Sequence, residues 1–253
     1  MLANNILSTI LLASAALAKS ELVKRSERHR RQAPAAIVEH NVCGNNYDFS
    51  ANKLSVEGGD SVTTELNVCN GDIASYSATW SVTSAPGALK ASPGFALANI
   101  GGKQLSSLKN IHAYWVWEWA QVQPSTSSLI GYHIYLGSAP NAGKAGAQTV
   151  VNIYLSAHNK NPLGDVVATD DIGGHRWQLY QSQGTSQTVF SFMNHQLVPG
   201  LKHFAMELEV FLAYLQAHLS VSSALYIVAV ESNIEIYGGS GSLLTKEWQM
   251  TLT

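Results

Sequence analysis

Charged residues, cysteines and prolines are scarce in this chain of 253 residues. Charged residues make up 13% of it, and it has only 2 cysteines and 7 prolines. A nucleic-acid binder would be strongly basic and a disordered chain would have few apolar residues. This sequence is instead 46% hydrophobic with a net charge of −2. The composition therefore excludes both classes and favours one large globular domain.

Several catalytic signatures are also missing from the sequence. It has no G-x-S-x-G elbow, no H-E-x-x-H helix and no phosphate-binding P-loop. No group of histidines and cysteines has the spacing of zinc ligands. We therefore expect no zinc site.

The first 31 residues differ from the rest of the chain. Residues 5–18 are apolar and end in the small-x-small form that signal peptidase cuts, and the run is short for a bilayer span. We interpret residues 1–18 as a signal peptide, which predicts a secreted, extracellular protein without a membrane partner. Residues 19–31 contain paired basic residues and predict a short propeptide whose cleavage point is not fixed. A disordered basic arm is the alternative.

Residues 32–253 are predicted to form the mature domain, and they are acidic. The first 31 residues hold 6 of the 15 basic and 2 of the 17 acidic residues, so 9 and 15 remain and the net charge is −6. Such a chain should not bind phosphate backbones, and a neutral polymer is the more plausible partner. Cys43 and Cys69 are the expected disulfide of a secreted protein, and it would contribute about 3 kcal/mol.

Short alternating segments separated by glycine, serine, asparagine and proline predict many β-strands. They occupy much of residues 47–82 and then 111–120, 129–137, 147–155, 175–181, 187–193 and 224–239. Helical spacing of apolar residues occurs once, over residues 201–219, and predicts one amphipathic helix outside the sheets. The pattern indicates an all-β jelly-roll sandwich of two antiparallel sheets with one α-helix.

The predicted strand at residues 147–155 has two very different faces. One row is apolar and consists of Val151, Ile153 and Leu155; the other consists of Val150, Asn152 and Tyr154. Polar rows also occur on the predicted strands that carry His133, Glu231, Asn233 and Glu235. Together they could line a cleft that binds sugars through aromatic faces and hydrogen bonds. A solvated sheet face is an equal alternative on periodicity alone.

The order of several segments resembles the family 12 glycoside hydrolases, which are secreted endo-β-1,4-glucanases and xyloglucanases with a jelly-roll fold. The resemblance runs from about Cys43 to the C-terminus. It rests on the cysteine pair, Ala78-Thr79-Trp80, residues 105–119, GYHIYLG against AYDLF, and NIYL against MIWL. Further matches are Pro162-Leu163-Gly164, GGHRWQLY, VFSF, and EIYGGSG against EPFTGSG. Fold follows more strongly from such a resemblance than function does.

The resemblance implies a retaining mechanism with two carboxyl groups about 5 Å apart. It also implies no metal and no organic cofactor, because this chemistry needs only carboxylates and water. The general acid/base position is Glu235, which is preserved. The nucleophile position, aligned on NIYL, is Val150, whose isopropyl group cannot attack an anomeric carbon. The resemblance therefore predicts lost or impaired hydrolysis.

Other positions that shape the centre of the family's cleft also differ. His133 replaces an aspartate, Asn152 a methionine, Tyr154 a tryptophan, Glu231 a glutamine and Asn233 a glycine. The family's NNLWG segment, which carries a sugar platform, has no counterpart in KLSVEGGDS. Trp80 and Trp117 remain candidate sugar-binding residues, with burial in the core as the alternative.

A substitute carboxylate is not evident from the sequence. Glu231 shares a face with Glu235, but four residues along a strand span about 13 Å, beyond the ~9.5 Å limit of an inverting pair. The face of Glu118 cannot be assigned, and Asp165, Asp170 and Asp171 are expected in loops.

Three functional hypotheses follow. The first is a monomeric secreted protein that binds β-1,4-glucan or xyloglucan but has lost the double-displacement reaction. The second is an active endoglucanase or xyloglucanase that uses a surrogate carboxylate. The third is a non-catalytic protein whose sandwich binds another protein, as an inhibitor or decoy of active relatives would.

Overall fold

The computed structural model describes residues 38–253 apart from positions 57, 84–86, 101, 185 and 195–201. Ala36–Thr253 forms a compact unit of its own. The signal peptide and propeptide predicted for residues 1–31 lie outside the described residues. Within the described part, no helix is long and apolar enough to cross a membrane.

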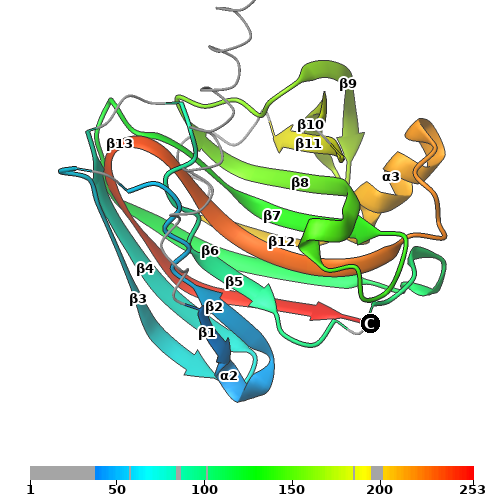
Figure 1. The fold of residues 1–253 in the computed structure, drawn as a ribbon, viewed down its shortest axis with the longest axis horizontal. Helices are drawn as coiled ribbons and strands as arrows, with labels where there is room; N and C mark the ends of the chain where they lie inside the picture. The colour runs from blue at the N-terminus through cyan, green and yellow to red at the C-terminus, as the bar shows by residue number, and fades with distance from the viewer. Residues whose placement is uncertain (1–37, 57, 84–86, 101, 185, 195–201) are drawn as a thin grey trace, which may run out of the picture. The chain divides into compact units, whose positions relative to one another are not determined.

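Two sheets pack against each other in this unit, which confirms the predicted jelly-roll sandwich (Figure 1). Sheet A runs in the order β1-β2-β5-β13-β7-β8-β11-β10-β9, and sheet B in the order β3-β4-β13-β6-β12. Sheet A contains β1 (Val38–Asn41), β2 (Tyr47–Ser50), β5 (Gly94–Leu97), β7 (Ser127–Gly137), β8 (Ala147–His158), β9 (Asp165–Ile172), β10 (His175–Gln183), β11 (Thr188–Asn194) and the first half of β13 (Tyr226–Leu252). Sheet B contains β3 (Ser61–Asn70), β4 (Ile73–Val82), β6 (Ile111–Val122), β12 (His203–Glu207) and the second half of β13. Neighbouring strands are antiparallel except β8 and β11, which are parallel.

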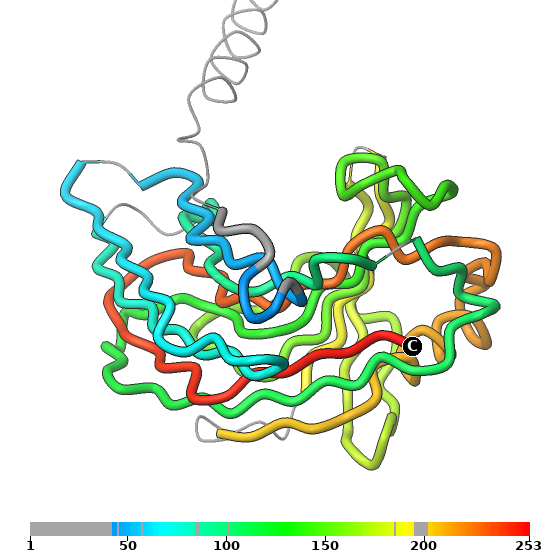
Figure 2. Tube along the Cα trace, turned by 90° about the horizontal axis from the view of Figure 1, so that it is seen from below, coloured from blue at the N-terminus to red at the C-terminus, as the bar shows by residue number. Residues whose placement is uncertain are grey.

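Strand β13 joins the two sheets and extends further than the sequence predicted. The alternation of apolar and polar residues is interrupted at Gly238 and Gly239, where the sequence predicts the end of the strand. The chain turns back there, and its second half pairs with β4 and β6 up to Leu252 (Figure 2). Gly239 has a φ of +74°, and a Cβ on it would lie 2.3 Å from the carbonyl oxygen of Ser125. Glycine is therefore required where the strand passes between sheets.

The core between the sheets is built from large aromatic and branched side chains. The apolar row of β8 lies in it as predicted, with Val151, Ile153 and Leu155 fully buried. The bulky buried indoles of this core are Trp80, Trp115, Trp117, Trp177 and Trp248. The opposite face of sheet A, which is turned away from this core, is called the outer face below.

The predicted helix begins eight residues later than expected. Residues 203–207 form β12, which pairs with β6, and only Glu209–Leu219 is helical (α3). Residues four apart, such as Phe204 and Leu208, lie on one face both in a helix and in a strand. Their spacing therefore does not distinguish the two structures. Short helical turns occur at α2 (Val42–Asn45), η1 (Leu105–Ser107) and η2 (Lys144–Gly146).

The disulfide between Cys43 and Cys69 is present, as the sequence predicted. It joins α2, beside β2 of sheet A, to β3 of sheet B, with the two Cα atoms 4.5 Å apart.

Candidate functional site

A row of side chains crosses the outer face of sheet A. The strand register pairs Asp48 with Ala96, Ala96 with Glu231, Glu231 with His133, His133 with Asn152, and Asn152 with Ser191. Paired residues on neighbouring strands point to the same side of a sheet. Six strands thus align the predicted site residues His133, Asn152 and Glu231 in one line.

His133 is held at the centre of this row by a hydrogen-bond chain. Its Nδ1 lies 2.9 Å from Oδ1 of Asn152, and Nδ2 of Asn152 donates to the hydroxyl of Ser191 at 3.1 Å. Because Oδ1 of Asn152 can only accept, the ring donates from Nδ1. Nε2 of His133 is buried without a hydrogen-bond partner and lies 3.8 Å from Oε1 of Glu235. A proton on this nitrogen would therefore face the Glu235 carboxylate.

Glu235 is the retained carboxylate of this face. Its two oxygens accept hydrogen bonds from the hydroxyl of Tyr154 at 3.2 and 3.3 Å, and Oε2 also accepts one from Tyr237 at 2.8 Å. Burial and the nearby charge of Glu235 raise the pKa of Tyr154 well above its usual value, so this phenol stays protonated and remains a donor. The structure thus brings Tyr154 and His133 to the carboxyl group of Glu235.

Glu231 is a second carboxylate on the outer face, four residues before Glu235 on β13. Oε2 lies 2.6 Å from Nζ of Lys144, and Oε1 accepts from Tyr135 at 2.9 Å and from Asn233 at 3.1 Å. Burial raises the pKa of Glu231, but the charges of Lys144 and His133 and the hydrogen bonds from Lys144 and Tyr135 outweigh it and lower the pKa below its usual value. Glu231 is therefore a carboxylate near neutral pH.

Val150 lies on the same outer face, paired with Tyr135 on β7 and Val189 on β11. It is diagonal to His133, whose direct partner is Asn152. Its side chain is 7% exposed and brings no acid, base or nucleophile to the row.

Trp80 and Trp117 do not belong to this site. Trp80 is 2% exposed on β4 and Trp117 is fully buried on β6, and both pack in the core of the sandwich. The expectation that they form sugar platforms is wrong, because a platform must present its ring to a ligand, and these rings face other core side chains.

The other candidate carboxylates lie on strands that do not neighbour the strand of His133. Glu118 lies on sheet B and pairs with Lys246 at 2.5 Å. Asp165, Asp170 and Asp171 lie on strand β9 and not in loops, which corrects the sequence-based expectation. Asp170 accepts from Tyr214 and Asp171 pairs with Arg176, at the edge of sheet A.

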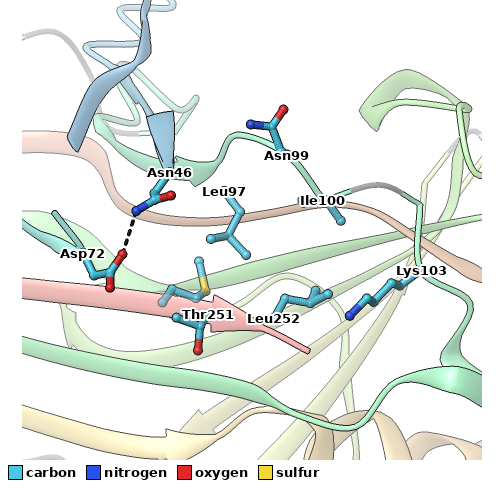
Figure 3. A pocket seen from close by; sticks show the side chains of 9 residues that line it. Asn46, Asp72, Leu97, Asn99, Ile100, Lys103, Thr251 and Leu252 are labelled. Atoms are coloured by element: carbon cyan, nitrogen blue, oxygen red, sulfur yellow. Dashed lines mark hydrogen bonds between the residues drawn. The ribbon is translucent and has the colours of Figure 1, made fainter. Parts of the chain in front are cut away.

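Two pockets in the described part of the chain differ in how they relate to the row. The first holds about 300 Å³ beside the row and is lined by Asp48, Ser50, Asn52, Ser92, Gly94, Phe95, Ala96, Lys144, Glu231 and Asn233. The second holds about 410 Å³ near the end of β13, where Asn46 donates to Asp72 at one end and Lys103 lies at the other (Figure 3). It contains none of the predicted site residues, so the first pocket is the one that extends the site.

Sequence reasoning missed Lys144, Asp48 and Ser191. Lys144 reaches the row from η2, and Asp48 and Ser191 come from strands far away in sequence. No local pattern marks these residues, because only the strand register aligns them. Among the described residues, no group of three or more histidine, cysteine or acidic side chains could hold a metal ion.

Comparison with known proteins agrees with this architecture. The probable xyloglucan-specific endo-β-1,4-glucanase A of Aspergillus clavatus is 26% identical over 193 residues, covering 75% of this chain and 77% of that protein. The xyloglucan-specific endo-β-1,4-glucanase A of Emericella nidulans is 26% identical over 186 residues, covering 72% and 74%.

Solved structures share the fold. The family GH12 endoglucanase 3 of Trichoderma harzianum superposes with a TM-score of 0.79 at 20% identity, covering 88% of this chain and 96% of that one. A ligand-bound family 12 xyloglucanase from Bacillus licheniformis gives 0.73 at 20% identity, covering 87% and 100%. The family profile described as Glycosyl hydrolase family 12 matches residues 45–253. The chain therefore belongs to glycosyl hydrolase family 12.

Proposed function

We propose that this protein binds a β-1,4-linked glucan or xyloglucan chain across the outer face of sheet A and has lost the family's double-displacement hydrolysis. Its named relatives are xyloglucan-specific endo-β-1,4-glucanases, which supports this class of polysaccharide. The proposal places the protein outside the cell, on the strength of the sequence of residues 1–18.

The observation that carries the proposal is the side chain at position 150. A retaining glycosidase needs a carboxylate that attacks the anomeric carbon and a second carboxyl group about 5 Å away. The family resemblance assigns the first role to position 150, and here a valine lies between Tyr135 and Val189. Without a nucleophile, no covalent glycosyl intermediate can form on β8.

The surroundings of Glu235 support the same conclusion. A general acid must give its proton to the leaving oxygen, so it needs to approach that atom freely. Here the carboxylate of Glu235 is tied to two phenols, Tyr154 and Tyr237, and the imidazole of His133 lies beside it. These contacts hold the carboxylate of Glu235 in place as a hydrogen-bond acceptor. They suit a group that binds ligand better than one that must donate a proton.

Restoring the missing group tests the catalytic half of the proposal. Val150→Glu is expected to gain slow release of reducing sugar from carboxymethylcellulose, barley β-glucan or xyloglucan, on which the unaltered protein is inactive, because it restores the nucleophile while the hydrogen-bonded Glu235 remains a poor proton donor. Val150→Gln has nearly the same shape without a carboxylate, so it is the matched control and should stay inactive. Turnover by the unaltered protein that Glu235→Gln abolishes would contradict the proposal.

Calorimetry tests the binding half. Cellotetraose or a xyloglucan oligosaccharide should bind the unaltered protein, and the absence of binding to both would overturn this half independently of the activity assay.

One observation favours a second candidate, an active glycosidase with a surrogate carboxylate. Glu231 and Glu235 are four residues apart on β13, and both interact with the same histidine, His133. If Glu231 acted as the base that activates water, the unaltered protein would hydrolyse glucan, and Glu231→Gln and Glu235→Gln would each abolish the activity.

A further inference from the structure

The pocket of about 300 Å³ beside the row has an unusual arrangement of charge. Asp48 and Glu231 are both register partners of Ala96, from β2 on one side and β13 on the other. Neighbouring strands lie about 4.8 Å apart, so the two Cβ atoms are roughly 9.6 Å apart. The methyl group of Ala96 between them leaves space above the sheet. Two carboxylates on side chains of these lengths can both reach one small cation in that space.

The chain already places a primary ammonium group at one of these carboxylates. Nζ of Lys144 lies 2.6 Å from Oε2 of Glu231, and both residues line the pocket. The Lys144 side chain is 54% exposed, whereas that of Glu231 is 10% exposed. The lysine can therefore swing into solvent at small cost, whereas the buried carboxylate it leaves requires another cation. The pocket is thus built to hold an ammonium group that a ligand could supply.

The remaining lining suits a sugar ring that carries such a group. Ser50, Asn52, Ser92 and Asn233 offer hydroxyl and amide groups for sugar hydroxyls. The acidic excess of residues 32–253, with 15 acidic and 9 basic residues, also attracts a polycation from a distance.

We propose that this pocket recognises the protonated amino group of a β-1,4-linked amino-sugar chain, a polymer of glucosamine. Such a chain has the same equatorial β-1,4 backbone as cellulose and carries an ammonium group in place of one hydroxyl on each ring. The ammonium group replaces Lys144 at Glu231 and is shared with Asp48. This inference rests on the proposed glycan-binding function and narrows it to a charged member of the same class.

Calorimetry with three tetrasaccharides tests the inference. The glucosamine tetramer, its N-acetylated form and cellotetraose are titrated into the unaltered protein at low salt and at a pH where the amine is protonated. The glucosamine tetramer should bind about 10-fold more tightly than the other two, because hydrogen bonds between charged groups exceed those between neutral ones. Added salt should reduce this advantage.

Variants then locate the effect. Asp48→Asn and Glu231→Gln should each weaken the glucosamine tetramer about 5-fold more than they weaken cellotetraose. Glu65→Gln is the matched control, since Glu65 is an exposed carboxylate on β3 of the other sheet and its loss changes the net charge equally. Lys144→Met removes the competing ammonium group and should strengthen binding of the glucosamine tetramer about 3-fold.

The outcomes separate this inference from the function on which it rests. Equal affinity for cellotetraose and the glucosamine tetramer, or a loss in Glu65→Gln as large as in Asp48→Asn, would overturn the inference and leave glucan binding intact. Weaker binding after Lys144→Met would also overturn it. Failure of all three tetrasaccharides to bind would overturn the proposed function as well.

Discussion

At the scale of single residues, the outer face of sheet A carries carboxylates with fixed partners. Glu235 is surrounded by phenols, and Glu231 by an ammonium group, a phenol and an amide. Active glycosidases keep one carboxyl group protonated and another free to attack. On this face both carboxylates instead accept hydrogen bonds from neighbouring side chains, which supports the proposal that the protein binds glucan without hydrolysing it.

The lowered pKa of Glu231 predicts a pH-dependent contribution to stability. Because the folded pKa lies below the unfolded value of about 4.3, ionised Glu231 stabilises the fold above that pH, and the contribution is lost as the pH falls through the folded pKa. Glu231→Gln should lower the free energy of unfolding by about 1 kcal/mol at neutral pH, since Lys144 is half exposed and screened by solvent. In urea unfolding, the difference between variant and unaltered protein should shrink as the pH falls from neutral through the folded pKa of Glu231.

Glu118→Gln is the control for this prediction. Glu118 also has a lowered pKa, through its hydrogen bond with Lys246, but both side chains of this pair are well exposed, at 38% and 50%, so the loss of Glu118 should leave stability almost unchanged. An equal loss of stability in both variants, or a Glu231→Gln effect that persists at low pH, would contradict the assignment.

At the scale of elements, the sequence was informative where one face of a strand is apolar and the other is not. The alternation of side chains in residues 147–155 predicts a strand with one buried apolar row, and β8 has this row. Strand β9 escaped prediction because it lies at the edge of sheet A and most of its side chains are exposed, which leaves no apolar row to detect. At the turn within β13 the sequence predicts the end of the strand, because glycine interrupts strands more often than it continues them.

The turn at Gly239 gives an element-scale prediction. Gly239→Ala places a Cβ against the carbonyl of Ser125 and forces a non-glycine residue to a φ of +74°, so it should destabilise the fold by about 2 kcal/mol or more. Gly59→Ala is the control, because its added Cβ meets nothing within 4 Å and its φ is not in the left-handed region. If denaturant unfolding gave equal midpoints for the two variants, the turn would not be constrained as described.

Helix α3 packs on sheet A through the aromatic ring of Phe211. Phe211 is fully buried and its ring lies 4.8 Å from that of Trp177 on β10 and 4.9 Å from that of Phe192 on β11. Phe211→Ala should cost about 3–5 kcal/mol through lost burial and the cavity left behind. Gln216→Ala on a partly exposed position of the same helix should change the unfolding free energy by less than about 0.5 kcal/mol. Similar losses in both would show that α3 does not pack as described.

At the scale of the whole molecule, the fold could be predicted from the sequence, but the site could be predicted only in part. The segments that resemble the family occur in order along one chain, so the sandwich followed from them. The row from Asp48 to Ser191 draws on six strands between residues 47 and 252. Its members become neighbours only through strand register, and a shift of one residue would turn any of them to the other face. Lys144 was missed for the same reason.

The disulfide provides a last prediction, at this same scale. Cys43 and Cys69 are 26 residues apart and join the β1–β2 end of sheet A to β3 of sheet B. Loss of this link frees the unfolded chain and should cost about 3 kcal/mol, which for a protein of this size corresponds to about 6–12 °C in the unfolding midpoint. Differential scanning calorimetry of the Cys43→Ser, Cys69→Ser double variant measures the shift. Added reductant should lower the midpoint of the unaltered protein to that of the double variant and leave the double variant unchanged. A double variant that unfolds at the unaltered midpoint would show that the two sheets hold together through their shared strand β13 and core alone.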